Sequence, residues 1–292
     1  MGTGRLRRPG GRGKVRRVQR PSPIAGVLFV DVDGTLVGAN DVAPRVWPAL
    51  ARLRERGWRV GVCTGRPGRG EALGYAARVD PEGLHVFESG AVVMRGDGTV
   101  VRADALPTAA VAEAIALGDA VGATVEVYTA AGGYHARERN TQIAAHEALL
   151  GVGATIGPLP AGPIVRVQWV VGDDAWPALE RGAAAIDGVD IHVGRSPRMP
   201  AVRFVAVTAR GVSKASGVRA ALALLGVPIE RAAMVGDNLN DIPALRIVGA
   251  AFVTADGAPE ALAIAHHVVP GPDAGGVADA AELLLAAFPE GL

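Results

Sequence analysis

The chain has 292 residues, 49% of them hydrophobic and 20% charged, which is enough apolar sequence to bury one large core or two modest ones. Its 40 glycines and 20 prolines follow no Gly-x-y repeat, which excludes a collagen-like protein, and its single cysteine, Cys63, excludes an internal disulfide. No apolar run approaches the roughly 18 residues that a membrane span requires. We therefore expect a globular protein of the cytoplasm, where cysteines stay reduced.

The formal net charge of +1 hides a basic N-terminus on an acidic body. Residues 1–20 carry eight basic side chains and no acidic one, which leaves 22 basic against 29 acidic residues elsewhere, a net charge of −7. An Arg- and Gly-rich segment with few apolar residues predicts a disordered tail over residues 1–22. This tail would either bind a nucleic acid or another anionic surface, or be a solvated extension. We favour the extension, and expect neither a nucleic acid nor a membrane as partner.

The first third of the chain alternates short apolar runs with amphipathic stretches. Residues 25–32 predict a buried strand, and residues 59–63 predict a second one. Helices are expected over 44–56 and 70–79, where apolar residues recur at helical spacing. Residues 92–94 and 99–102 flank Gly96-Asp97-Gly98, a turn signal that predicts a hairpin.

The middle of the chain has a different rhythm. Helices are expected over 109–121, 142–150 and 175–186, and strands over 124–128, 164–170, 191–193 and 202–207. Gly- and Pro-rich joints at 151–163 and 194–200 separate them. We interpret residues 104–208 as an inserted α+β domain.

Beyond residue 208 the strand–helix alternation returns. Helices are expected over 214–225, 239–248, 259–265 and 277–287, and strands over 232–235, 251–253 and 268–269. Such alternation is typical of a parallel sheet covered by helices on both faces. The predicted fold is therefore a Rossmann-like, doubly wound α/β core built from residues 23–103 and 209–292, with the α+β domain inserted between them.

Acidic residues follow two of the predicted core strands. Asp31 and Asp33 end the first strand, and Asp237 and Asp241 follow the strand over 232–235, one helical turn apart. The carboxyl edge of a parallel sheet is where such folds bind ligands, and close carboxylates call for a cation. Each pair alone could instead be a surface turn or a helix cap.

A hydroxyl and an ammonium group occupy two further strand ends. Thr64 and Gly65 follow the second strand and could present O–H and N–H groups to an anion. Only Lys14 and Lys214 are lysines among 30 basic residues. Because Arg serves nearly everywhere else, Lys214 at a helix start indicates a need for a compact ammonium, such as one that holds a phosphate.

These strand ends together predict a site for phosphoryl chemistry, since carboxylates, a hydroxyl and an ammonium are what such a site requires. The Asp31–Thr35 sequence DVDGT, the Thr64 segment, Lys214 and the GDNLND sequence over 236–241 resemble, in this order, the four motifs of haloacid dehalogenase-like (HAD) phosphatases. The position of the insertion is similar to the Cof-type subgroup, whose α+β (C2) cap lies there. The resemblance covers most of residues 25–290.

The resemblance implies a Mg²⁺-dependent phosphomonoester hydrolase that acts on a small phosphorylated metabolite. Asp31 would be the nucleophile that forms an aspartyl-phosphate, and Asp33 the general acid and base. The Asp31 and Asp237 carboxylates and the Asp33 carbonyl would hold the metal, with Asp241 steadying it. The groups implied to bind the phosphoryl oxygens are Thr64, Gly65, Lys214 and Asn240.

The cap would select the leaving group, and the sequence offers polar candidates near predicted strand ends and loops: Tyr134, His135, Arg137, Arg166 and Arg195. Two positions depart from the subgroup pattern, because Ser89 and Gly257 stand where Asn is usual, which puts substrate preference in doubt.

Three other functions compete with the phosphatase. A phosphoaspartate receiver uses similar residues, but the insertion of about a hundred residues argues against it. A non-catalytic phosphate-binding or nucleic-acid-binding protein fits poorly with four chemically complete positions on an acidic body. A phosphomutase or phosphotransferase on the same scaffold stays open, as do the substrate and the oligomeric state.

Overall fold

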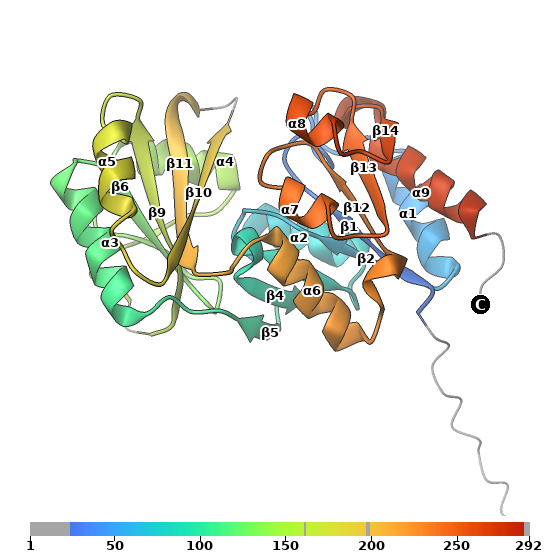
Figure 1. Ribbon diagram of the computed structural model, residues 1–292, viewed down its shortest axis with the longest axis horizontal. Helices are drawn as coiled ribbons and strands as arrows, with labels where there is room; N and C mark the ends of the chain where they lie inside the picture. Colours follow the sequence, from blue (N-terminus) through green and yellow to red (C-terminus); the bar gives the residue numbers. More distant parts are fainter. Residues whose placement is uncertain (1–23, 161, 197–198, 289–292) are drawn as a thin grey trace, which may run out of the picture.

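A computed structural model of the chain describes residues 24–160, 162–196 and 199–288. Two α/β modules lie side by side, and the chain passes from the first to the second after β5 and returns after β11 (Figure 1). We call them the core module and the inserted module. The predicted tail, residues 1–22, lies outside the described residues.

The core module is organised around a five-stranded parallel sheet of order β14-β13-β12-β1-β2. Its strands are β1 (Gly26–Val30), β2 (Trp58–Val62), β12 (Ala232–Gly236), β13 (Ala250–Thr254) and β14 (His267–Val269). Val30 is in register with both Val62 and Val235, so the carboxyl ends of β1, β2 and β12 coincide. Residues that follow these three strands are therefore brought together at one edge.

Helices cover both faces of this sheet. Successive β1 side chains point to opposite sides, and because all of them are apolar or glycine, both faces must be buried. Leu28 and Val30 pack in one apolar cluster with α1, α2 and α9, whereas Val27 and Phe29 pack in another with α6, α7 and α8. The helices are α1 (Val46–Glu55), α2 (Gly70–Val79), α6 (Lys214–Leu225), α7 (Ile242–Leu245), α8 (Pro259–Leu262) and α9 (Gly276–Ala287).

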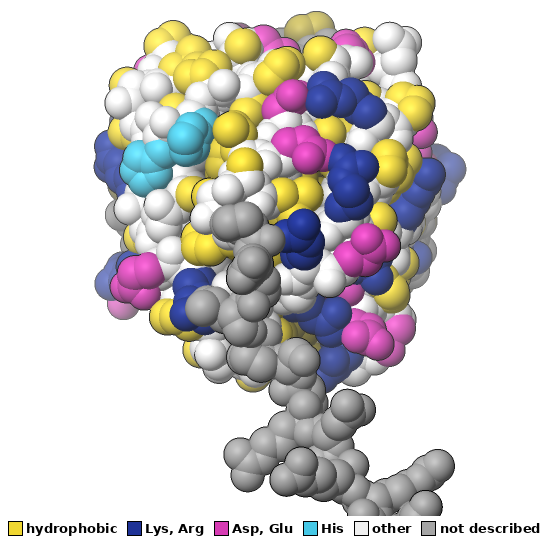
Figure 2. All heavy atoms as spheres, turned by 90° about the vertical axis from the view of Figure 1, so that its right-hand side faces the viewer, with side chains coloured by type: hydrophobic (Ala, Val, Ile, Leu, Met, Phe, Trp, Pro, Cys, Tyr) yellow, Lys and Arg dark blue, Asp and Glu magenta, His cyan; other side chains and the backbone are white. Residues whose placement is uncertain are grey.

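The outer surface near α1 and α9 mixes charges of both signs. Figure 2 shows basic and acidic side chains interspersed on that side of the core module. Two ion pairs, Arg45–Asp279 and Arg52–Glu282, connect α1 to α9. Exposed pairs of this kind contribute little to stability, so apolar packing beneath them holds the two helices in place.

A three-stranded antiparallel sheet, β3 (Leu84–Phe87), β4 (Val92–Arg95) and β5 (Val100–Ala103), extends the core beyond β2. A single bridge between Cys63 and Val86 joins it to the end of β2. The buried His85 reinforces the junction, because its Nδ1 accepts a hydrogen bond from the Val62 N–H and its Nε2 lies 3.0 Å from the Asp80 carbonyl oxygen.

The inserted module contains a six-stranded sheet of order β10-β11-β9-β6-β7-β8. Its strands are β6 (Thr124–Thr129), β7 (Tyr134–Ala136), β8 (Thr155–Ile156), β9 (Ile164–Gly172), β10 (Val189–Ser196) and β11 (Met199–Ala209). Its helices are α3 (Thr108–Ala120), α4 (Thr141–Leu150) and α5 (Trp176–Ala183). Helices α3 and α5 cover the outer face of the sheet, and α4 contacts α2 on the side of the core module (Figure 1).

The predicted fold class, a doubly wound parallel core with an inserted α+β unit, is confirmed. Helices α2 and α6 begin and end where the sequence predicts. In α6, Ser213 caps the start in a capping box and Gly226 ends the helix in a left-handed conformation. The helix expected over 239–248 is shorter, at Ile242–Leu245, and strands β3, β7 and β8 were not predicted. No helix among the described residues is long and apolar enough to cross a bilayer.

Candidate active site

Three aspartates meet at the carboxyl edge of the parallel sheet. Asp31 directly follows β1, Asp237 directly follows β12, and Asp241 lies four residues further on. One carboxylate oxygen from each lies within 4.8 Å of the others, a spacing that can hold a metal ion. The carboxylates predicted from two separate strand ends therefore do come together.

Lys214 is placed against this cluster as the first residue of α6. Its Nζ lies 2.8 Å from Asp31 Oδ1 and 2.5 Å from Asp241 Oδ1, and its side chain is only 1% exposed. Three carboxylates and one ammonium, when all are ionised, leave two negative charges at a largely buried position. That surplus is the complement of a divalent cation.

Burial and the neighbouring charges together shift the pKa values of the cluster. Burial, reinforced by the charge of Asp241, raises the pKa of Asp31 well above its usual range although Lys214 opposes the shift. Burial and Asp241 likewise raise the pKa of Asp237 to about 6. Burial alone would lower the pKa of Lys214, but the neighbouring carboxylates Asp241 and Asp31 raise it above its usual value.

Hydrogen bonds from the backbone and from a hydroxyl orient the two C-terminal acids. Asp241 Oδ2 accepts from the N–H groups of Asp237, at 3.1 Å, and Asn238, at 3.0 Å. Thr35 Oγ1 donates to Asp237 Oδ1 at 2.9 Å. Gly34 has a φ of 80°, which favours glycine, and a Cβ there would also push against Asp237 Oδ2 as the DVDGT turn passes this carboxylate.

Thr64 and Gly65 follow β2, next to the turn that carries Asp31. Thr64 is buried, and its Oγ1 accepts a hydrogen bond from the Arg66 N–H at 3.1 Å. The Thr64 carbonyl oxygen accepts from the N–H of Ser89, whose φ of 57° lies in the left-handed region. Asn tolerates this conformation better than Ser, which gives a backbone reason for the Asn that the resemblance leads us to expect here.

Asp33 and Asn240 are not drawn into the acidic cluster. The Asp33 carboxylate is 56% exposed and pairs with Arg66, whose guanidinium also contacts Glu71. Asn240 is exposed on the turn before Asp241. The carboxylate predicted to act as acid and base is thus separated from the carboxylates that can hold a metal.

The five candidate selectors in the inserted module have different environments. Tyr134 and Arg166 are buried, and Tyr134 donates a hydrogen bond to Glu126 within the module. His135 is half-buried. Arg137 and Arg195 are exposed and paired with acidic neighbours of the same module, Asp119 and Asp173. Arg166 contacts the core module, at the Gly65 carbonyl oxygen and the Glu88 carboxylate.

Arg66, Glu88 and Thr35 were not predicted as site residues. Glu88 directly follows β3, is 1% exposed and ion-pairs with Arg166. Burial raises its pKa to about 7, although Arg166 opposes the shift. The sequence carried one signal for Glu88, which directly follows the largely apolar run 84–87. An acid in such a position is expected to be buried, and a buried acid needs a charged partner.

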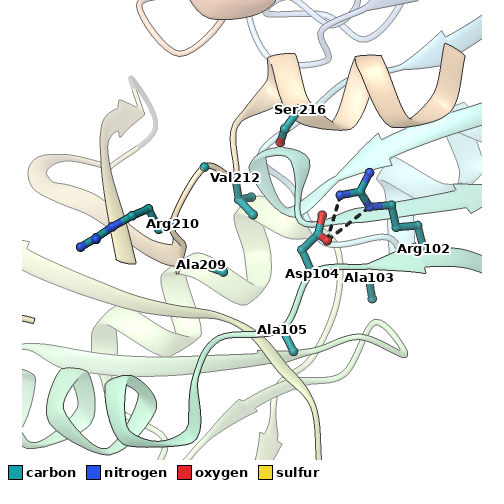
Figure 3. A pocket seen from close by; sticks show the side chains of 9 residues that line it. Arg102, Ala103, Asp104, Ala105, Ala209, Arg210, Val212 and Ser216 are labelled. Carbon is teal, nitrogen blue, oxygen red and sulfur yellow. Dashed lines mark hydrogen bonds and ion pairs between the residues drawn. The ribbon is translucent and has the colours of Figure 1, made fainter. Parts of the chain in front are cut away.

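A hollow of about 300 Å³ lies where the two connections between the modules meet. Figure 3 shows Arg102 paired with Asp104 on the first connection, and Ala209 to Val212 on the second. The acidic cluster is not part of its lining.

Comparison with known proteins places this arrangement in a family. Residues 28–150 and 201–280 match the family model of haloacid dehalogenase-like hydrolases, and the chain belongs to that family. The match spans most of the core module, including the strand ends that carry Asp31, Thr64 and Asp237 and the start of α6, where Lys214 lies. No curated protein matches the chain.

Solved structures share the fold at low sequence identity. A haloacid dehalogenase-like hydrolase from Bacteroides thetaiotaomicron is 19% identical with a TM-score of 0.77, over 89% of this chain and 99% of that one. A HAD subclass IIB sugar phosphatase is 21% identical with a TM-score of 0.74, over 89% and 98%. A haloacid dehalogenase-like hydrolase from B. subtilis is 18% identical with a TM-score of 0.75, over 89% and 100%.

Proposed function

We propose that this HAD-like hydrolase is a Mg²⁺-dependent phosphatase that cleaves a small, sugar phosphate-like phosphomonoester through an aspartyl-phosphate on Asp31. The observation that carries the proposal is the charge of the site. Three carboxylates share one buried ammonium, which leaves a surplus of two negative charges where β1 and β12 end. A divalent cation would balance this surplus and would place positive charge beside an anionic phosphoryl group.

The residues fit a hard, oxygen-liganded cation. Mg²⁺ prefers carboxylate and carbonyl oxygens, and the turns after β1 and β12 offer both. The Asp31 and Asp237 carboxylates and the Asp33 carbonyl would hold it, and Asp241 would orient the site from behind through its bonds to backbone N–H groups. The ion would supply positive charge beside the phosphoryl oxygens.

In the proposed reaction, an Asp31 carboxylate oxygen attacks phosphorus, and the bond from phosphorus to the alcohol oxygen breaks. Asp33 donates its proton to the departing alkoxide and then accepts a proton from the water that hydrolyses the aspartyl-phosphate. Free phosphate and the original Asp31 result. The groups proposed to hold the phosphoryl oxygens are Thr64, Gly65, Lys214 and Asn240.

We propose that residues 104–208 act as a cap that excludes water and selects the leaving group. Contacts between the modules support this, because Arg69 donates to the Gly132 carbonyl and Arg166 contacts Gly65 beside the site. The preference for a sugar phosphate is supported by one structural relative, which is described as a sugar phosphatase. The remaining candidates for selection are Tyr134, His135, Arg137 and Arg195.

A phosphate-release screen over a panel of phosphomonoesters, with and without Mg²⁺, tests the proposal. We expect release that requires the cation, and its loss in Asp31→Asn with an unchanged circular dichroism spectrum. Asp174→Asn, an exposed acid of the inserted module, is the matched control and should remain active. A fully active Asp31→Asn would refute the assignment, and transfer without free phosphate would indicate a phosphomutase instead.

A further inference from the structure

Arg166 extends from strand β9 of the inserted module to two groups of the core module. Its Nη1 donates a hydrogen bond to the Gly65 carbonyl oxygen, and its Nη2 lies 2.9 Å from Glu88 Oε2. The side chain is only 4% exposed. A buried guanidinium thus bridges the inserted module and the loop proposed to bind phosphate.

The segment that carries Glu88 is fitted closely between two parts of the proposed site. The Glu88 N–H donates to the Arg66 carbonyl, and the Ser89 N–H donates to the Thr64 carbonyl, both at 3.1 Å. On the other side, a Cβ on Gly90 would overlap the Ser213 carbonyl oxygen, directly before Lys214. A shift of this segment would therefore displace both the Thr64 loop and the start of α6.

The backbone of this segment is held in a conformation that side chains disfavour. Glu88 has a φ of 53° and Ser89 a φ of 57°, both in the left-handed region, and Gly90 follows at 110°. Two consecutive non-glycine residues in this region persist only where surrounding contacts hold them. The ion pair with Arg166 is such a contact.

This ion pair does not satisfy the hydrogen-bonding capacity of its members. Within the described part of the chain, neither carboxylate oxygen of Glu88 accepts a hydrogen bond of good geometry, and Arg166 Nε donates none. A buried ion pair of this kind contributes little net stability, since desolvation offsets the attraction. A role in positioning accounts for it better than a role in stability.

The inserted module fixes the direction of Arg166 from behind. Its guanidinium stacks on the Tyr128 ring, with 3.8 Å from Cζ to the ring centroid. The Tyr128 hydroxyl donates to the buried carboxylate of Glu126. The same carboxylate also binds three other side chains: Tyr134, His146 and Gln168.

We propose that Arg166 is a positioning residue that couples docking of the inserted module to the shape of the Thr64–Gly65 loop. With the module docked, the guanidinium holds the Gly65 carbonyl and the Glu88 carboxylate, and the loop keeps the form that binds a phosphoryl group. Without Arg166, the loop and the strained segment Glu88–Gly90 lose their common partner. The inference rests on the proposed phosphatase function, in which this loop holds the phosphoryl oxygens.

The test compares three variants with a matched control. Arg166→Met removes the charge, Arg166→Lys keeps the charge without the planar fork, and Glu88→Gln removes the partner's charge. Arg203→Met is the control, because Arg203 also pairs with an acid and stacks on an aromatic ring, Asp173 and Trp176, but entirely inside the inserted module.

For the enzyme, kcat, KM and the inhibition constant of inorganic phosphate are measured. We expect Arg166→Met to weaken phosphate inhibition and raise KM at least tenfold, because a small displacement of binding groups has effects of this size. Arg166→Lys should recover part of the loss. In a double variant, Glu88→Gln should add little to the effect that Arg166→Met has on KM and on phosphate inhibition. Arg203→Met should match the wild type. Equal effects of Arg166→Met and Arg203→Met would overturn the proposal.

Hydrogen exchange of the full chain, with no substrate present, gives a second readout. Arg166→Met or, if that variant does not fold, Glu88→Gln should lose amide protection at residues 64–66 and 88–90, while β12 and β13 stay protected. Loss of protection confined to the inserted module would overturn the coupling. If the wild type releases no phosphate, the proposed function fails, but this measurement still decides the coupling.

Discussion

Arg66 holds Asp33 in a two-point ion pair, with 2.6 Å between Arg66 Nη2 and Asp33 Oδ1 and 2.8 Å between Arg66 Nε and Asp33 Oδ2. The guanidinium is 6% exposed, whereas the Asp33 carboxylate is 56% exposed. Its third contact, to Glu71, anchors it to α2. A buried, anchored fork therefore restricts the rotamers of a carboxylate that would otherwise move freely in solvent.

This geometry predicts that Arg66→Lys lowers kcat about tenfold or more, since lysine cannot reproduce a two-point contact and a misdirected general acid loses its contribution. KM should change less than kcat, because the proposed role of Asp33 is in proton transfer. Steady-state kinetics with the best substrate of the screen measures this. Arg78→Lys on the exposed side of α2 is the control, and equal effects of the two changes would contradict the prediction.

Lys214 provides a second prediction, because it is the only ammonium within contact of the acidic cluster in the described part of the chain. Lys214→Met leaves three nearby carboxylates without their positive partner. We expect activity to fall at least about a hundredfold, as when a group that stabilises transition-state charge is removed. We also expect Lys214→Met to have a lower melting temperature than the wild type when both are measured without divalent cations.

Lys214→Arg should not restore this activity, since the Nζ position is enclosed by Asp31 and Asp241 and a planar fork is larger than an ammonium. Thermal denaturation and phosphate release, measured side by side, separate the effect on folding from the effect on chemistry. An active, stable Lys214→Met would contradict both the assignment and the charge argument.

The parts of the fold that the sequence predicted carry strong local signals. Helix α6 has a Ser cap at its start and Gly226 at its end, and both boundaries were predicted correctly. Strand β3 was missed because its link to β2 depends on one bridge and on the His85 side chain, neither of which periodicity reveals. Helix α7 is shorter than predicted, because the segment before Ile242 forms the turn that orients Asp241.

The candidate site likewise combines residues that local sequence signals predict with residues whose contacts depend on tertiary packing. Asp31, Asp237 and Asp241 could be predicted together, because the ends of neighbouring parallel strands must coincide, and Lys214 could be added because it is one of only two lysines and begins a helix. The partners of Asp33 and Arg166 could not, since Arg66 and Glu88 meet them through side-chain directions that only the packed structure defines. Charged residues next to apolar strands were the weak signal available for both.

His85 predicts an acid sensitivity of the fold that is independent of catalysis. Burial lowers its pKa from 6.5 to about 4, so the folded protein keeps it neutral while the unfolded chain takes up a proton. Its contribution to stability is therefore present above about pH 6.5 and is lost as the pH falls towards 4, by about 3 kcal/mol in total. Urea unfolding of the wild type and of a His85 variant over this range should show the decline as a difference between the two, since the raised pKa values of Asp237 and Glu88 act in the opposite direction in both proteins.

The His85→Gln variant is the control for this decline. It removes the titratable ring but keeps an amide that can approach the Val62 N–H. We expect lower stability at neutral pH and a flatter profile between about pH 6.5 and 4. An unchanged pH profile in the variant would show that other groups cause the acid sensitivity.

The last prediction concerns protons and metal at the acidic cluster. Because burial and Asp241 raise the pKa of Asp237 to about 6, the metal-free folded protein binds a proton there more readily than the unfolded chain does. That contribution to stability is present at low pH and is lost as the pH rises through about 6. A bound cation requires the deprotonated carboxylate, so metal affinity should rise over the same interval.

The gain in melting temperature on adding Mg²⁺ should therefore be larger at about pH 8 than at about pH 5. Since the comparison is made with and without metal at each pH, the titration of His85 affects both samples equally and cancels. Asp237→Asn should abolish most of the gain at both pH values, whereas Asp174→Asn should leave it intact. An equal gain at the two pH values in the wild type would mean that the cation binds elsewhere than at these carboxylates.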